Sequence, residues 1–426
     1  MQKMQGGIAV FAAAPMRNRN SDVDHEYRQD SDFFYLTGFD EPESFCVLAP
    51  GNQKHEYLLF VLPRDKEKET WTGVRAGVEG AIQQFGAEMA HTTDKLEEIL
   101  TELLQNAPAL HYSLNKYPES DRRIFAALDS VRAKGRAGIY APSRIIDPWE
   151  TLSEMRLYKK LDELEALQRA VDISVRAHSA AMKATAPGRF EYEIQAVLEY
   201  AFRASGSQRN GYPSIVGSGS NTCILHYTRN NRKLQDGDLI LIDAGAEFDY
   251  YTADITRTYP ANGKFTSAQR AVYELVLEAQ KKAITHMRPG ITWMQVHSLT
   301  VGTLTQGMIS LGLLQGRLDE NLENENYKKY YMHRTGHWLG LDVHDAGRYR
   351  KTETWSVLEP GMVMTVEPGL YIPPDDENKT FRGIGVRIED DVLITKDDPR
   401  VLSAACPKEI DDLEAIVGTA GLPEIP

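Results

Sequence analysis

The chain has 426 residues, of which 42% are hydrophobic and 26% are charged, a composition typical of globular proteins. This length exceeds what one compact core usually organises, so two domains are expected. The net charge of -13 argues against a nucleic-acid-binding protein or one attracted to acidic membranes, because both need clustered cations. Cys46, Cys223 and Cys406 lie far apart, which predicts a reducing, cytoplasmic environment without structural disulfides.

The first 150 residues alternate short apolar runs with helical patterns. Strands are predicted over residues 8–14, 44–49 and 57–61, and helices over residues 78–85 and 94–104. We interpret residues 8–14 as a buried strand rather than the core of a signal peptide, because a convincing basic leader is lacking. The pattern predicts a small α/β domain that ends near residues 142–148.

A long helical pattern follows. From Leu161 to Met182, apolar residues recur every three or four positions, as on one face of a helix. His178 lies on this face, so we interpret it as a packing residue. Pro187-Gly188 ends the pattern, and another helix is predicted over residues 192–203.

An internal repeat organises the rest of the chain. Residues 168–171 (QRAV) recur at 269–272, and each copy leads to a Pro-Gly pair. Residues 234–245 (LQDGDLILIDAG) align without gaps on residues 358–369 (LEPGMVMTVEPG), which places Asp243 opposite Glu367. Two matches in the same order indicate a duplicated half-domain, whose equivalent strands offer equivalent carboxylates to one shared centre.

Two carboxylates are predicted to meet in a hairpin over residues 240–259. With a turn at Phe248 and Asp249, Asp243 and Asp254 fall directly opposite each other on one face, about 5 Å apart. The apolar neighbours of Asp243 indicate a covered strand, where two carboxylates repel each other unless a cation lies between them. Two exposed strand aspartates are the alternative.

The second half-domain offers Glu367 and Glu389. Arg387 is two residues from Glu389, so we expect both on one strand face, where the guanidinium would orient a carboxylate ligand. A plain surface Arg–Glu pair is the alternative.

Three of the eleven histidines, His333, His337 and His344, lie within one short segment. Gly336 and Gly340 argue against a regular helix there. One imidazole with four carboxylates makes an oxygen-rich centre, which favours manganese, or iron or cobalt, over structural zinc.

The four carboxylates and the histidines lie within four motifs: LILIDAGAEFDYYTADITRTYP, HRTGHWLGLDVHD, TVEPGLY and GIGVRIEDD. These motifs resemble those of the two-metal peptidases of the pita-bread fold. Within that family, the sequence is most similar to aminopeptidase P, the Xaa-Pro aminopeptidases. DSDFFYLTGFDEPES and ETWTGVRAG resemble their amino-terminal domain. The resemblance implies an α/β amino-terminal domain over residues 1–150 and an α+β pita-bread catalytic domain over residues 151–426, in a homo-oligomer (dimer or tetramer).

The resemblance also implies a ligand set for two divalent ions, which we expect to be Mn²⁺. Asp243 would bind one ion and His337 the other, Asp254 and Glu389 would bridge both, and Glu367 would complete the second site. Glu367 would also act as the general base.

Further roles follow from the same resemblance. His226, His333 and His344 align with substrate-binding and proton-transfer histidines, and Tyr371 and Arg387 with groups that support the metal ligands. Tyr212 is expected to line a proline pocket. Trp71 resembles a residue that reaches the neighbouring subunit's active site in bacterial relatives, with a core tryptophan as the alternative. Arg334 and Gly336 depart from the smaller and hydroxyl residues of some bacterial members, so altered pocket detail is expected.

The implied function is removal of the first residue from peptides with proline in second position. A prolidase, which cleaves Xaa-Pro dipeptides, would share the five ligands, and Arg348 or Arg350 could then capture the substrate carboxylate. The HRTGHWLG and Trp71 segments favour the aminopeptidase. A methionine aminopeptidase fits poorly, since such enzymes often lack this large amino-terminal domain. A binding module that has lost its metal is disfavoured because all five ligands are present.

Overall fold

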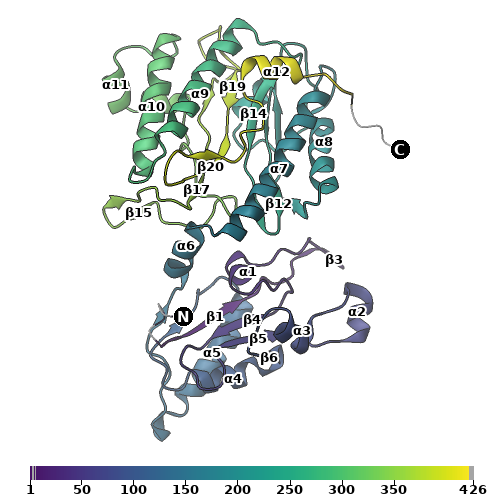
Figure 1. Ribbon diagram of the computed structural model, residues 1–426, viewed down its shortest axis with the longest axis vertical. Coiled ribbons are helices and arrows are strands. Elements are labelled where there is room, and N and C mark those ends of the chain that lie inside the picture. The colour runs from purple at the N-terminus through teal and green to yellow at the C-terminus, as the bar shows by residue number, and fades with distance from the viewer. Residues whose placement is uncertain (2–3, 5, 422–426) are drawn as a thin grey trace. The chain divides into compact units, whose positions relative to one another are not determined.

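A computed structural model describes residue 1, residue 4 and residues 6–421. The chain divides into two compact units, Met1–Leu152 and Ser153–Pro426, each with its own core (Figure 1). No helix among the described residues is long and apolar enough to cross a membrane.

The first unit is built on a six-stranded mixed sheet in the order β6-β5-β4-β1-β7-β8. Its strands are β1 Ile8–Ala12, β4 Phe45–Leu48, β5 Tyr57–Val61, β6 Met89–Thr92, β7 Leu110–His111 and β8 Ile145–Ile146, with the small pair β2 Asn18–Asn20 and β3 Val23–Asp24 outside it. Its helices are α1 Ser31–Thr37, α2 Lys66–Thr72, α3 Gly77–Gln83, α4 Leu96–Leu103 and α5 Pro118–Arg132, and α6 Trp149–Leu157 spans the boundary between the units.

Alternating residues of β5 separate the core of this unit into two layers. Leu58 and Phe60 pack with the apolar residues of α4 and α5, whereas Leu59 and Val61 pack with Phe33 of α1 on the opposite face, as a strand covered on both faces requires. The predicted strands and helices of this region are present with ends shifted by a few residues, and the predicted α/β class is confirmed.

The second unit contains two similar sets of helices and strands. Its helices are α7 Leu161–Ala184, α8 Glu191–Ala204, α9 Ser267–His286, α10 Trp293–Ser310, α11 Leu318–Glu323 and α12 Ile410–Ile416, and two 3₁₀ turns are η4 Gly219–Cys223 and η5 Asn326–Lys329. Its strands are β9 Arg209–Asn210, β10 Ile215–Ser218, β11 Leu239–Asp243, β12 Ala246–Phe248, β13 Tyr251–Thr252, β14 Thr256–Pro260, β15 Arg350–Lys351, β16 Thr354–Trp355, β17 Val363–Val366, β18 Gly369–Tyr371, β19 Gly385–Arg387, β20 Asp390–Leu393 and β21 Arg400–Val401.

The predicted repeat is visible in this order of elements. α7 and α8 precede the antiparallel pair β11–β14, and α9 and α10 precede the antiparallel pair β17–β20. In Figure 1 the strands lie between α7 and α8 on one side and α9 and α10 on the other. A bridge between Thr256 and Glu389 joins the two halves, so the ends of both strand pairs meet at one place.

The predicted pairing of residues across the first hairpin is wrong. Asp243 pairs with Thr256 rather than with Asp254, because the turn lies at Asp249 and Tyr250, one residue later than expected. Both turn residues have positive φ, 46° and 69°, as a two-residue turn suited to the twist of a hairpin requires. Asp254 is therefore a diagonal neighbour of Asp243 on the same face, rather than its direct partner.

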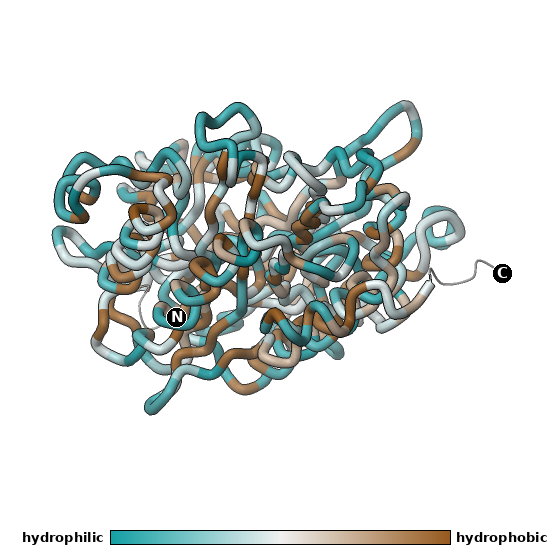
Figure 2. Tube along the Cα trace, turned by 90° about the horizontal axis from the view of Figure 1, so that it is seen from above, coloured by the Kyte–Doolittle hydropathy of each residue, from teal (hydrophilic) through white to brown (hydrophobic). Residues whose placement is uncertain are grey.

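The tube of Figure 2 shows how hydropathy follows this arrangement. Hydrophobic stretches, in brown, alternate with hydrophilic ones along the tube, and many protruding loops are hydrophilic. β11 and β17 belong to the buried stretches, since all of their residues are buried. The carboxylate residue at the end of β11 and the one directly after β17 are therefore attached to buried strands.

Candidate metal centre

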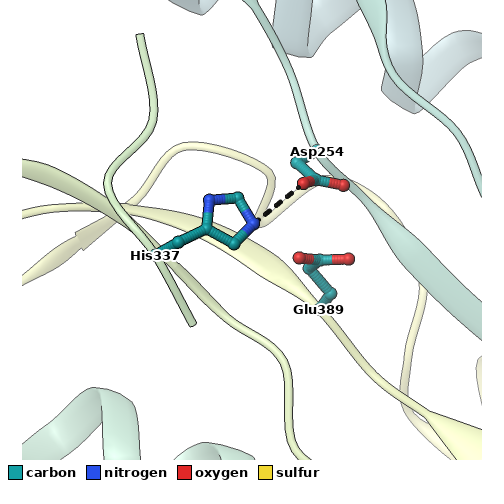
Figure 3. A group of neighbouring side chains, drawn as sticks. All are labelled: Asp254, His337 and Glu389. Carbon is teal, nitrogen blue, oxygen red and sulfur yellow. Dashed lines mark ion pairs between the residues drawn. The ribbon is translucent and has the colours of Figure 1, made fainter. Parts of the chain in front are cut away.

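Three side chains from three separate segments converge where the two halves meet. One ligand atom from each of Asp254, His337 and Glu389 lies within 4.8 Å of the other two (Figure 3). His337 Nε2 is 3.3 Å from Asp254 Oδ2 and 3.6 Å from Glu367 Oε1. Glu367 therefore borders the same centre.

Asp243 joins the centre through shared partners. The Tyr212 hydroxyl lies 2.6 Å from Asp243 Oδ1 and 2.5 Å from Asp254 Oδ1. The single O–H of Tyr212 can donate to only one of these two carboxylates at a time, so the other carboxylate oxygen receives no hydrogen bond from Tyr212. On its other side, Asp243 Oδ2 accepts a hydrogen bond of 2.6 Å from Arg387 Nη2.

A strand-like segment carries His337 to the carboxylates. Thr365 N donates to His337 O, and His337 N donates to Thr365 Oγ1, at 2.9 and 3.0 Å. Glu367 N donates to the carbonyl of Thr335 at 2.8 Å. Gly336 permits this approach, because a Cβ there would lie only 1.9 Å from Thr365 O. The expectation that the histidine segment is not a regular helix is confirmed.

The hydrogen bonds of His337 fix which nitrogen faces the carboxylates. Nδ1 lies 3.0 Å from the carbonyl oxygen of Trp338, which can only accept, so Nδ1 carries a proton. Nε2 therefore faces the carboxylates and is free to bind a metal when the ring is neutral. Burial would lower the pKa of His337, but the nearby Asp254 and Glu367 carboxylates raise it to about 9, as expected for a group surrounded by negative charge.

The crowding of carboxylates also perturbs their own ionisation. Burial, together with the Asp254 carboxylate, raises the pKa of Glu367 to about 7, against the opposing charges of His337 and Arg387. Burial and the same carboxylates raise the pKa of Glu389 well above its usual value. Three buried carboxylates, the partly exposed Glu367 and the Nε2 of His337 form a donor set that suits a hard or borderline divalent cation, whose charge would offset the repulsion among the carboxylates.

A chain of hydrogen bonds leads from this centre to His333. Arg387 Nη1 donates to the Tyr371 hydroxyl at 3.0 Å, and that hydroxyl lies 2.9 Å from His333 Nε2. His333 Nδ1 is 2.8 Å from the carbonyl of Arg334, so Nδ1 is the protonated nitrogen and Nε2 accepts from Tyr371. Burial lowers the pKa of His333 to about 3, which keeps the ring neutral.

The remaining histidines surround the centre at different depths. His344 is exposed, and its ring meets that of His337 edge-on with 4.3 Å between centroids. His226 is exposed as well. Burial, and after it the neighbouring His337, lowers the pKa of His344. His178 is fully buried, as expected for a packing residue, and its Nε2 lies 3.0 Å from the carbonyl of Ala244 beside Asp243.

Two alternatives left open by the sequence are excluded. Arg387 and Glu389 both contact the Thr256 hydroxyl, at 3.2 and 2.6 Å, and the carboxylate that Arg387 contacts directly is Asp243, at 2.6 Å. A surface Arg–Glu pair is excluded, since Arg387 is only 3% exposed. Trp71 is 85% exposed on α2, which excludes the alternative of a core tryptophan.

Some supporting residues were missed by sequence reasoning. Thr256 Oγ1 donates to Glu389 Oε2 at 2.6 Å, and Asp391 Oδ2 accepts from the backbone N–H of Asp254 at 3.1 Å. Asp391 could have been noticed as the last acid of the GIGVRIEDD motif. Nothing in the local sequence distinguishes Thr256 from other strand threonines.

Comparison with known proteins places this geometry in a family. The model of metallopeptidase family M24 matches residues 165–396, and the model of the aminopeptidase P N-terminal domain matches residues 1–111. The chain belongs to metallopeptidase family M24. It is thus a peptide hydrolase of a metal-dependent family, and the four carboxylates and His337 lie within the matched region.

Relatives within family M24 resemble the chain over nearly its whole length. The Xaa-Pro aminopeptidase of Escherichia coli is 41% identical over 421 residues, covering 98% of this chain and 95% of the relative. The structure of Pseudomonas aeruginosa aminopeptidase PepP has a TM-score of 0.94 and 49% identity, covering 96% of this chain and 93% of that one. Zinc-substituted E. coli aminopeptidase P in complex with product has a TM-score of 0.93 and 41% identity, covering 96% and 94%.

Proposed function

We propose that this metallopeptidase removes the first residue from peptides with proline in second position, using two Mn²⁺ ions. The observation that carries the proposal is the convergence of Asp243, Asp254, His337, Glu367 and Glu389 on one buried centre. The names of the relatives support the choice of an Xaa-Pro aminopeptidase over a prolidase. The oxygen-rich donor set favours manganese.

The five ligands would hold the ions. Tyr212 and Arg387 would keep Asp243 in place, and Thr256 would keep Glu389 in place. When bound, the ions supply Lewis acidity for the scissile carbonyl and for water. The negative charge of the centre attracts the free ammonium group of the substrate. This attraction restricts cleavage to the first residue.

Glu367 would act as the general base. Its carboxylate is partly exposed at the edge of the centre, 3.6 Å from His337 Nε2, and a carboxylate placed in this way can accept a proton from water and pass it on. It accepts the proton of the attacking water and returns it to the leaving proline nitrogen. His333, held neutral and oriented by Tyr371, together with His226 and His344, contacts the substrate beside the scissile bond.

The amino-terminal unit would contribute Trp71 in a homo-oligomer (dimer or tetramer). An indole that is 85% exposed on a helix without buried residues suits a contact between subunits. We place the protein in the cytoplasm, where its free cysteines Cys46, Cys223 and Cys406 stay reduced. Light scattering on wild type and Trp71→Ala tests the assembly, and unchanged mass with unchanged activity would contradict this role.

The activity is tested with three peptides and manganese-loaded protein. Release of the first residue from Xaa-Pro-Xaa, with Xaa-Ala-Xaa uncleaved, is expected. Cleavage of the dipeptide Xaa-Pro alone would instead identify a prolidase and direct attention to Arg348 and Arg350. Glu367→Gln should bind manganese but lose most of kcat, and an unchanged kcat would overturn the role of general base.

A further inference from the structure

A cavity of about 580 Å³ lies in the catalytic unit between α10, the η5 turn and the segment that leads to His337. α10 contributes residues at three- and four-residue spacing, so one face of this helix forms a wall: Met294, His297, Ser298 and Val301. Its volume is within the range of pockets that bind small molecules and peptide segments. Figure 1 shows α10 and α11 along one edge of the unit.

The cavity adjoins the metal centre through His333. This residue and Arg334 belong to the cavity wall, while His333 Nδ1 lies 3.7 Å from Glu367 Oε2 and its Nε2 contacts the Tyr371 hydroxyl. A peptide whose scissile bond lies at Glu367 therefore meets the cavity within the next few residues.

The charge of the cavity wall is opposite to that of the centre. Lys328 and Arg334 are its cations, and Glu325, which pairs with Lys328, is its carboxylate. Arg334 is exposed, and within the described part of the chain its polar contact is Nη1 to Met294 Sδ at 3.8 Å, without a carboxylate partner. Burial, and after it the charges of Arg334 and Lys328, lowers the pKa of His297 to about 4, which keeps its ring neutral.

These opposite charges define the direction of a bound peptide. Its ammonium end is attracted to the carboxylates of the centre and repelled by Arg334, whereas a carboxylate further along the chain is attracted to Arg334. An arginine also offers two parallel N–H donors that match the two oxygens of a carboxylate. Lys328 offers no such pair of donors, and its charge is partly neutralised by Glu325. Apolar residues of the wall, including Met294 and Val301, suit the intervening side chains.

We propose that this cavity is a subsite for the residues after the proline, and that Arg334 selects peptides that carry a carboxylate there. The carboxylate is either an acidic side chain or the free C-terminus of a short peptide. This subsite rests on the proposed aminopeptidase function and adds a substrate class to it. Arg334 is one of the positions at which altered pocket detail was expected from the sequence.

The test compares amidated peptides Ala-Pro-Ala-Ala, Ala-Pro-Asp-Ala and Ala-Pro-Lys-Ala, and Ala-Pro-Ala with a free or amidated C-terminus. Manganese-loaded wild type, Arg334→Met and Arg334→Glu are assayed for kcat/KM. Arg288→Met removes an exposed arginine that pairs with Asp398 outside the cavity, and serves as a control for net charge. We expect wild type to prefer a carboxylate peptide by about fivefold, the scale of an exposed ion pair.

This preference should weaken with added salt, disappear in Arg334→Met, shift toward the lysine peptide in Arg334→Glu and persist in Arg288→Met. A preference for Ala-Pro-Asp-Ala over Ala-Pro-Ala-Ala identifies an acidic side chain as the group that Arg334 binds. A preference for Ala-Pro-Ala with a free C-terminus over its amidated form identifies the C-terminal carboxylate. Equal rates for all peptides in wild type, or a preference retained in Arg334→Met, would overturn the subsite. If no proline peptide is cleaved, the proposed function fails instead. The cavity is then tested by itself: calorimetry compares the affinities of Pro-Asp-Ala-amide and Pro-Ala-Ala-amide for wild type and for Arg334→Met.

Discussion

Gly336 offers a direct test of how backbone packing positions the metal ligands. A Cβ at this position would lie 1.9 Å from Thr365 O and 2.8 Å from Thr365 Oγ1. Non-bonded carbon and oxygen atoms need at least about 3 Å, so Gly336→Ala must separate the histidine segment from β17 by about 1 Å. That displacement stretches two hydrogen bonds between His337 and Thr365: the 2.9 Å backbone bond from Thr365 N to His337 O, and the 3.0 Å bond from His337 N to Thr365 Oγ1.

The expected costs follow from this displacement. Overpacking in a close-packed interior destabilises by about 1–3 kcal/mol, and misplacing a catalytic group by 1 Å lowers the rate by about 100-fold. We therefore expect Gly336→Ala to unfold at a lower urea concentration and to lose about 100-fold in kcat/KM on a proline tripeptide. Weaker binding of Mn²⁺ is expected as well, because His337 moves relative to Glu367 and Asp254.

Gly302→Ala is the matched control. Gly302 lies within α10, and a Cβ there has nothing within 4 Å, so alanine should be neutral or stabilise the helix by up to about 1 kcal/mol. Urea unfolding, calorimetric titration with Mn²⁺ and steady-state kinetics are measured on both variants. Wild-type values of all three for Gly336→Ala would refute the reasoning that close approach at Gly336 positions His337.

Three other predictions address the surroundings of the centre. Burial alone would raise the pKa of Asp345, but its two buried cationic partners hold the pKa low. Asp345→Asn should therefore lower the free energy of unfolding by about 3–5 kcal/mol at pH 7. The difference between wild type and Asp345→Asn in urea unfolding should shrink as the pH falls below about 4, where the carboxyl group of the unfolded chain is protonated. A constant difference down to pH 2 would contradict this. Tyr371→Phe removes the hydroxyl that orients His333, and should lower kcat/KM by about ten- to hundredfold; full activity would disprove that role. Thr256→Val removes the donor to Glu389 and should weaken Mn²⁺ binding about 10- to 100-fold in calorimetry, and an unchanged affinity would exclude Thr256 as a support.

Repetition and periodicity in the sequence predicted the overall design of the catalytic unit. The gapless alignment of residues 234–245 on 358–369 predicted equivalent strands, and β11 and β17 occupy equivalent places. This succeeds because a duplicated sequence keeps its hydrophobic pattern in both copies. Asp243 and Glu367 accordingly lie at the ends of these strands.

The exact partners of side chains were less predictable. Tyr250 adopts positive φ in the hairpin turn, which local preference disfavours for an aromatic residue, and Arg209 packs over its ring at 5.5 Å. That placement depends on tertiary contacts, so the one-residue shift that separates Asp254 from direct pairing with Asp243 could not be read from the sequence. The interruption between Arg387 and Glu389 likewise depends on how β19 and β20 join different sheets.

The most direct test of the proposed centre is a single titration that follows Mn²⁺ binding and peptide cleavage together. Metal-depleted protein is titrated with Mn²⁺ while bound metal and release of the first residue from Xaa-Pro-Xaa are measured, with Asp254→Asn as the comparison. We predict that cleavage is absent without metal, rises as up to two ions bind per chain, and stays low in Asp254→Asn. Full cleavage by the metal-depleted wild type, or cleavage that does not follow metal binding, would contradict a metal-dependent aminopeptidase built on these five ligands.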